Sequence, residues 1–158
     1  RRMREYQRTT RECSFNDFQP EIRTAIRNYV EKHELGDIEE DVLMCAETVS
    51  EKIKQGFFSK IFGGANYAQN VSMLVTPERL LWCAQDSRNN RVVSAARLSE
   101  IEIGDFESSL VEDCGLSVFG FVNRSPERVR AFIGLGAEAA AQKFRRTVKE
   151  TAAKAKSK

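Results

Sequence analysis

The chain of 158 residues lacks the features that mark several classes of protein. It has no run of about 18 or more apolar residues, so no membrane-spanning helix is expected. It also has no segment with the charged, apolar and small-residue order of a secretion signal, so we do not expect secretion. A chain of this length favours one domain with a buried core of its own.

Metal-binding and disulfide patterns are missing as well. The four cysteines, Cys13, Cys45, Cys83 and Cys114, include no pair at CxxC spacing, and His33 is the only histidine. A structural zinc site needs four such ligands at recognisable spacing, so we expect no metal. Free cysteines are among the most buried residue types, and we expect buried free thiols in a reducing cytosol.

Catalytic motifs are equally scarce. No G-x-S-x-G motif is present, and no nucleophile is placed beside His33, which we expect to be a solvated residue near a helix end. The stretch GLGAEA, residues 134–139, matches a dinucleotide fingerprint. However, the acidic residue that such a fold needs about 20 residues later is absent. We therefore expect a glycine turn there, no cofactor and no enzyme activity.

Charge is unevenly distributed along the chain. Residues 1–11 have a net charge of +4 and residues 143–158 of +6, and with a total of +2 this leaves −8 for the residues between them. Basic ends on an acidic body suit docking to phosphates or an acidic partner, but such blocks are also commonly solvated tails. Neither end has much apolar surface, so we expect residues 1–11 and 152–158 to be poorly ordered or separately docked.

The periodicities predict a helix, a series of strands and a second helix. Residues 15–36 have apolar side chains at helical spacing, and residues 137–156 carry a narrow apolar stripe that includes Phe144 and Val148. Between them, residues 40–135 read as short strands with polar turns, as in an antiparallel sandwich or small barrel. We expect about seven strands, within residues 41–53, 70–76, 79–86, 91–98, 99–106, 115–122 and 128–135. The expected domain covers residues 15–158, preceded by a basic arm over 1–14.

One stretch, VSMLVTPERLLWCAQD, resembles the strand–turn–strand signature of bacterial pleckstrin-homology-like (PH-like) and GRAM-like domains. In that signature an apolar strand ends in Thr, turns, and resumes with Arg, Leu, an aliphatic residue and an aromatic one. The matching positions are Leu74, Thr76, Arg79, Leu80, Leu81 and Trp82. The resemblance covers about residues 40–155 and implies a mainly β (α+β) fold. That fold is a seven-stranded antiparallel split barrel capped by a C-terminal helix, here with an extra N-terminal helix, and Phe144 and Val148 are candidates to fill its open corner.

The segment QGFFSKIFGGANY, residues 55–67, combines glycines typical of a loop with many apolar side chains. The PH-like resemblance places it between the first and second strands, where Lys52, Lys54 and Lys60 match the loop lysines of phosphoinositide-binding members. The next strand has no Lys or Arg. A multi-phosphate inositol pocket needs several convergent cations, so that pocket is not predicted.

The sequence leaves three interpretations of this loop open. The residues concerned are Lys54, Phe57, Phe58, Lys60, Ile61 and Phe62. They could fill a pocket of a partner protein, which would make the chain a protein-interaction domain. They could instead insert into an anionic membrane surface, as in a peripheral lipid-binding module over residues 54–67. Alternatively, the apolar side chains could cover the N-terminal helix.

The expected location is cytoplasmic, with peripheral membrane binding in the second of these interpretations. A nucleic-acid partner is not expected, although the basic ends would supply phosphate contacts. The reason is that we expect no strand face of exposed aromatic residues interleaved with Lys or Arg.

Overall fold

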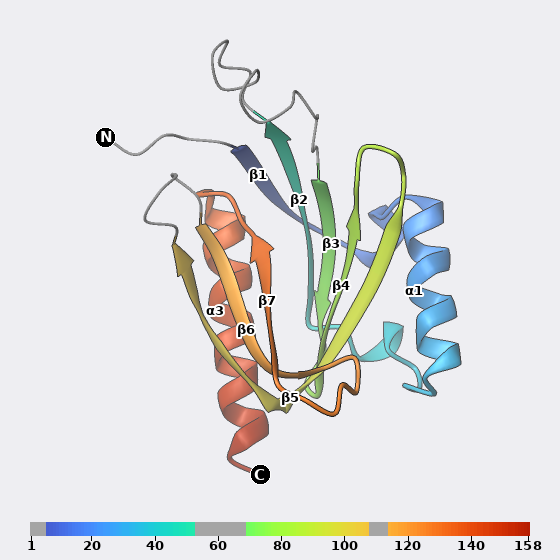
Figure 1. Ribbon diagram of the computed structural model, residues 1–158, viewed down its shortest axis with the longest axis vertical. Coiled ribbons are helices and arrows are strands. Elements are labelled where there is room, and N and C mark those ends of the chain that lie inside the picture. The colour runs from blue at the N-terminus through green and yellow to red at the C-terminus, as the bar shows by residue number, and fades with distance from the viewer. Residues whose placement is uncertain (1–5, 53–68, 108–113) are drawn as a thin grey trace.

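The computed structural model describes residues 6–52, 69–107 and 114–158. Within these ranges seven strands form one antiparallel sheet in which every strand pairs with its neighbours in sequence (Figure 1). The elements are β1 (Tyr6–Cys13), α1 (Pro20–Lys32), β2 (Met44–Lys52), β3 (Gln69–Val75), β4 (Arg79–Gln85), β5 (Arg91–Glu107), β6 (Cys114–Val122), β7 (Val129–Gly134) and α3 (Ala139–Lys156). Short 3-10 helices cover Phe15–Asp17 and Glu39–Asp41. No helix of the described ranges is long and apolar enough to cross a membrane.

The N-terminal segment was expected to be a basic arm, and this is wrong for residues 6–13. They form the edge strand β1, paired with β2 from Tyr6 opposite Lys52 to Cys13 opposite Cys45. A strand at a sheet edge needs little apolar surface, because its backbone bonds to one neighbour while its side chains reach solvent. The chain's other end is also more ordered than expected, since α3 runs to Lys156.

Residues 91–98 and 99–106 were expected to be two strands, but they belong to the single long strand β5. The register of β5 against β6 shifts between Ala96 and Ile101, so the strand continues through an irregularity that bends the sheet. Here β6 comes so close that a Cβ on Gly120 would meet the Glu100 carbonyl oxygen, and Gly120 has φ +147°. The seven strands are therefore β1 plus all seven expected segments, of which two are merged into β5, in the expected order along the chain.

Two helices pack on opposite faces of the bent sheet. The inner face, defined as the one against α3, forms the larger core, in which Phe144 and Val148 are fully buried as expected. On the outer face, Ile22 and Ile26 of α1 pack against the β2–β5 part of the sheet. Their partners there include Cys45, Leu74, Leu81, Cys83 and Ala95. The expected helices of residues 15–36 and 137–156 are thus present over shorter ranges, with their apolar stripes directed at the sheet.

The sheet does not close into a complete barrel, since β1 and β7 share no ladder among the described residues. Polar bonds instead join β1 to the connection between β7 and α3. The Gly136 N–H donates to Thr10 Oγ1 at 2.9 Å, and the Thr10 N–H donates to the Glu138 carboxylate at 3.0 Å. Thr10 Oγ1 is also 2.8 Å from Thr48 Oγ1 on β2. These bonds hold the two edges of the sheet near the N-terminal end of α3.

Candidate functional site

The loop residues singled out in sequence, Lys54, Phe57, Phe58, Lys60, Ile61 and Phe62, lie outside the described residues, so their roles stay predictions. One correction concerns their place in the chain: they fall between β2 and β3, not between the first and second strands. A second observation bears on the proposal that they cover the N-terminal helix. The apolar face of α1 already packs on the sheet, so this helix supplies little reason for the loop to fold onto it.

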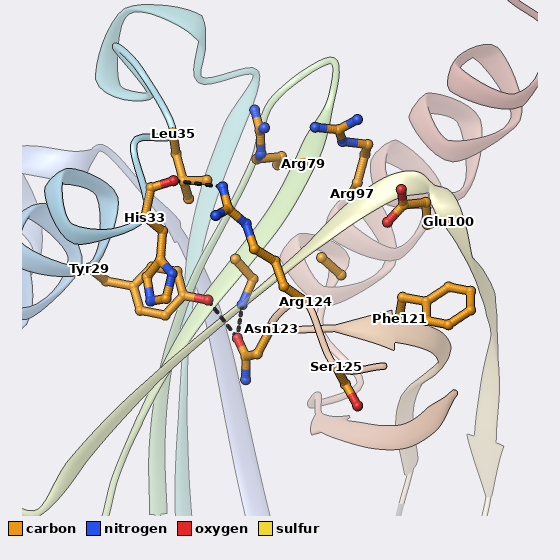
Figure 2. A pocket seen from close by; sticks show the side chains of 12 residues that line it. Tyr29, His33, Leu35, Arg79, Arg97, Glu100, Phe121, Asn123, Arg124 and Ser125 are labelled. Atoms are coloured by element: carbon orange, nitrogen blue, oxygen red, sulfur yellow. Dashed lines mark hydrogen bonds between the residues drawn. The ribbon is translucent and has the colours of Figure 1, made fainter. Parts of the chain in front are cut away.

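The described residues enclose a different site, a half-open cleft of about 560 Å³ (Figure 2). It lies where the C-terminal end of α1, the β3–β4 turn, the bend of β5 and the β6–β7 turn meet. In Figure 1 this is the lower end of the sheet, while the ends of β2 and β3 that flank residues 53–68 are at the upper end. The cleft is lined by Tyr29, His33, Leu35, Arg79, Ala95, Ala96, Arg97, Glu100, Phe121, Asn123, Arg124 and Ser125.

The helical wall of the cleft is made by Tyr29 and His33, one turn apart at the end of α1. Their rings lie in contact, with centroids 4.2 Å apart. Half-burial raises the pKa of Tyr29, with a smaller opposing effect from Arg124, so its hydroxyl remains a donor and bonds to Asn123 Oδ1 at 2.7 Å. His33 was expected to be a solvated helix-end residue. It does end the helix, but it is half-buried against Tyr29.

The opposite wall is the tight turn between β6 and β7. The Ser125 N–H donates to the Val122 carbonyl at 3.0 Å, and both central residues, Asn123 and Arg124, have φ +55°. These are the features of a type I′ turn. Asn123 ties the turn to β5, because its Oδ1 accepts the Ala95 N–H at 2.9 Å and its own N–H donates to the Ala95 carbonyl at 2.8 Å.

Arg124 occupies a backbone conformation that costs a side-chain-bearing residue about 1–2 kcal/mol relative to right-handed geometry. The guanidinium Nη2 of Arg124 donates to the His33 carbonyl at 2.7 Å, which joins the turn to the end of α1. Figure 2 shows this side chain reaching across the cleft from the turn toward the helix. The strained turn thus places a cation over the C-terminal end of the helix, where the helix dipole favours positive charge.

Two further arginines complete the cleft. Arg79, the first residue of β4, is largely buried, with 16% of its side chain exposed, and its Nη1 is 3.3 Å from the exposed Glu78 carboxylate. Arg97 extends from the bend of β5 and is exposed. Glu100 is the one carboxylate among the described lining residues. Three guanidinium groups from separate chain segments can bind an anion by paired N–H donors, and nothing in the lining set resembles a nucleophile beside a general base.

The structure also corrects the expectation that no strand face carries exposed aromatic residues with interleaved arginines. The outer face of β6 and β7 carries Phe119, Phe121, Arg130 and Phe132, and Arg128 lies just before β7. Arg130 lies over the Phe119 ring at 5.0 Å and Arg128 over the Phe121 ring at 5.7 Å. The strand period put these residues on one face, but the sequence did not indicate that neither α1 nor α3 would cover it.

The free cysteines of the described residues are Cys13, Cys45 and Cys83. Burial is the main reason that the pKa of Cys13 and of Cys45 rises to about 12, and that of Cys83 to about 11. Thiols held protonated in this way are poor nucleophiles and poor metal ligands. Across residues 6–52, 69–107 and 114–158, no three His, Cys, Asp or Glu side chains gather as a metal site requires.

Comparison with protein-family models, with curated proteins and with solved structures finds no match for this chain.

Proposed function

We propose that the chain is a non-enzymatic binding module built on a PH-like split barrel. Support for the fold comes from the meander of seven antiparallel strands followed by a C-terminal helix. Phe144 and Val148 of that helix are buried against the inner face, as the resemblance requires of the residues that fill the barrel's open corner. The free thiols support a location in the reducing cytoplasm, where disulfides are rare.

The module acts in protein interaction, and its partner presents an acidic segment to the arginine cleft, defined as the cleft lined by Arg79, Arg97 and Arg124. The single observation that carries this is the convergence of these three guanidinium groups beside one carboxylate, Glu100. Arginine is the side chain best suited to a carboxylate partner, because its planar fork donates two parallel hydrogen bonds. The strain accepted at Arg124 is a second support, since strained backbone concentrates at functional sites.

The test is a titration of the ¹⁵N-labelled protein with a hexaglutamate peptide, followed by amide chemical shifts, with inorganic phosphate as a separate arm. We expect saturable shifts at Asn123, Arg124 and Ser125. Replacing Arg97 and Arg124 together by Gln should weaken peptide binding by about tenfold or more, since hydrogen bonds to charged groups contribute about 1.5–3 kcal/mol each. Arg146→Gln, an exposed change on α3, is the matched control and should leave binding unchanged.

Three outcomes would contradict the proposal. If the wild-type protein does not bind hexaglutamate, the cleft does not recognise an acidic segment of a partner. If it binds phosphate and not the peptide, the cleft is a site for a small anion. Peptide binding that survives the double Gln change would place the interaction elsewhere on the molecule. The peripheral membrane role of residues 54–67 remains a prediction from sequence, because it depends on residues outside the described ranges.

A further inference from the structure

A second surface, separate from the cleft apart from Phe121, lies on the outer face of β6 and β7. We call it the phenylalanine face and define it by Phe119, Phe121, Arg128, Arg130 and Phe132. In Figure 1, α3 lies behind β6, and neither α1 nor α3 lies in front of β6 or β7. Phe132 is 53% exposed, and Phe119 and Phe121 are half-buried. Phenylalanine rings that gather at least partly exposed on one face of a sheet are uncommon unless something binds there.

The order of side chains on this face is regular. Phe119 and Phe121 are two residues apart on β6, so their side chains point the same way about 7 Å apart. On β7 Arg130 and Phe132 repeat the same spacing, Arg128 lies just before the strand, and Arg130 stands directly opposite Phe119 in the register. Arg130 is held by a bond from Nη1 to Ser117 Oγ at 3.0 Å. Aromatic rings and guanidinium planes therefore alternate across two adjacent strands.

The charges around the face are mixed. Glu102 of β5 stands opposite Phe119, on the side away from Arg130. Glu127 lies in the turn beside Arg128, and Glu100 lines the neighbouring cleft together with Arg97 and Arg124. A surface that binds the phosphate backbone of a duplex would need more positive charge than this face carries. What the face offers is flat ring and guanidinium surface, with two arginines placed between the rings.

We propose that the phenylalanine face binds single-stranded nucleic acid, with bases stacked on Phe119 and Phe132 and with Arg128 and Arg130 contacting phosphates. Single strands are held in this way on other sheets, because every base has a flat face that stacks on an aromatic ring or a guanidinium plane. The rings are on strands whose backbones are fixed by the sheet, so little ordering is needed on binding. This inference goes beyond the proposed function and depends on different side chains.

The experiment measures fluorescence anisotropy of labelled single strands of about 12 nucleotides, both RNA and DNA. An abasic strand of the same length and a duplex of the same sequence are measured in parallel, with hexaglutamate as an unlabelled competitor. We expect the wild-type protein to bind the single strands and to bind the abasic strand and the duplex at least tenfold more weakly. This arm separates base stacking from attraction to phosphates.

The variants are chosen so that the fold survives. Phe119→Leu with Phe132→Leu keeps apolar bulk but removes the flat rings, and it should weaken single-strand binding by about tenfold or more. Arg128→Gln with Arg130→Gln should reduce the slope of log affinity against log salt by about 1.4, since each phosphate contact on a single strand contributes about 0.7. Glu102→Gln removes a repelling charge beside Phe119 and should strengthen binding. Arg146→Gln on α3 is the control for unspecific charge effects.

Each remaining outcome overturns the proposal. Absence of single-strand binding does so directly. Equal affinity for the abasic strand, or full competition by hexaglutamate, would mean that the surface recognises negative charge alone and suits an acidic peptide. Full binding by the double Leu variant would show that the rings do not stack on bases. If nucleic-acid binding is lost only when Arg97 and Arg124 are changed, the nucleic acid binds in the arginine cleft and not on the phenylalanine face. This result also distinguishes a failure of the nucleic-acid proposal from a failure of the proposed peptide binding.

Discussion

Replacing Thr10 by Val should destabilise the fold by about 2–3 kcal/mol, although Val has almost the same shape. Thr10 is 3% exposed, and its hydroxyl is bonded both to the Gly136 N–H and to Thr48 Oγ1. Val removes the hydroxyl and leaves a buried backbone N–H without its acceptor, which costs about 1–3 kcal/mol. The buried hydroxyl of Thr48 loses its partner at the same time.

The assay is equilibrium unfolding in urea, followed by far-UV circular dichroism. For a chain of this length, a loss of about 2–3 kcal/mol should lower the thermal midpoint by about 4–12 °C. The matched control is Thr9→Val, the same chemical change at the neighbouring, exposed position of β1, which should shift stability by about 0.5 kcal/mol or less. A Thr10→Val, Thr48→Val double variant should lose less than the sum of the two single changes, because the two hydroxyls bond to each other.

The reasoning fails if Thr10→Val behaves like Thr9→Val. In that case the bonds between β1 and the β7–α3 connection would contribute nothing to stability, and the sheet edges would be held by apolar contacts alone. Strict additivity in the double variant would likewise contradict the bond between Thr10 and Thr48.

Three shorter predictions follow from other parts of the chain. Gly120→Ala should cost about 3 kcal/mol in thermal unfolding, because its Cβ would meet backbone of β5, whereas Gly104→Ala on β5 has open space and should cost far less. Changing Phe58 and Phe62 to Ser should leave the thermal midpoint nearly unchanged if they form a contact surface, and a drop of many degrees would mean that they are core. Bonds from two basic side chains of α3 hold the pKa of Asp105 below its ordinary value. The free energy of unfolding of the wild type should therefore exceed that of Asp105→Asn by its full amount above about pH 4, and the difference should decline as the pH falls further.

Local signals in the sequence were sufficient for much of the fold. The apolar stripe with Ile22 and Ile26 and the stripe with Phe144 and Val148 both identified helix faces that the structure buries. Strand spacing predicted the segments that form β2 to β7, although it divided β5 in two, because turn residues separate the strands at regular intervals. β1 was missed since its side chains are nearly all polar, and an edge strand is stabilised by backbone pairing that leaves no apolar pattern.

The arginine cleft could not be predicted in the same way. Arg79, Arg97 and Arg124 are far apart in the chain, and only the bend of β5 brings their segments to one end of the sheet. One local signal was present: Asn123 and Arg124 form a short turn between two apolar strands, where a type I′ turn favours Asn followed by Gly. An arginine in the position that favours glycine is a departure that sequence reasoning can detect.

That departure leads to a last prediction, which compares Gly and Ala at position 124. Both changes remove the bond to the His33 carbonyl, and both should weaken binding of hexaglutamate in the cleft. Only Gly adopts the φ of +55° without strain, whereas Ala keeps the conformational cost of about 1 kcal/mol. Arg124→Gly should therefore unfold in urea within about 1 kcal/mol of wild type, and Arg124→Ala should be less stable than the Gly variant by about 1 kcal/mol. Equal stability of the two variants would mean that the turn is not strained at this residue. If the Gly variant binds hexaglutamate as well as wild type does, the Arg124 cation is not needed in the cleft, and peptide binding does not explain the strained turn.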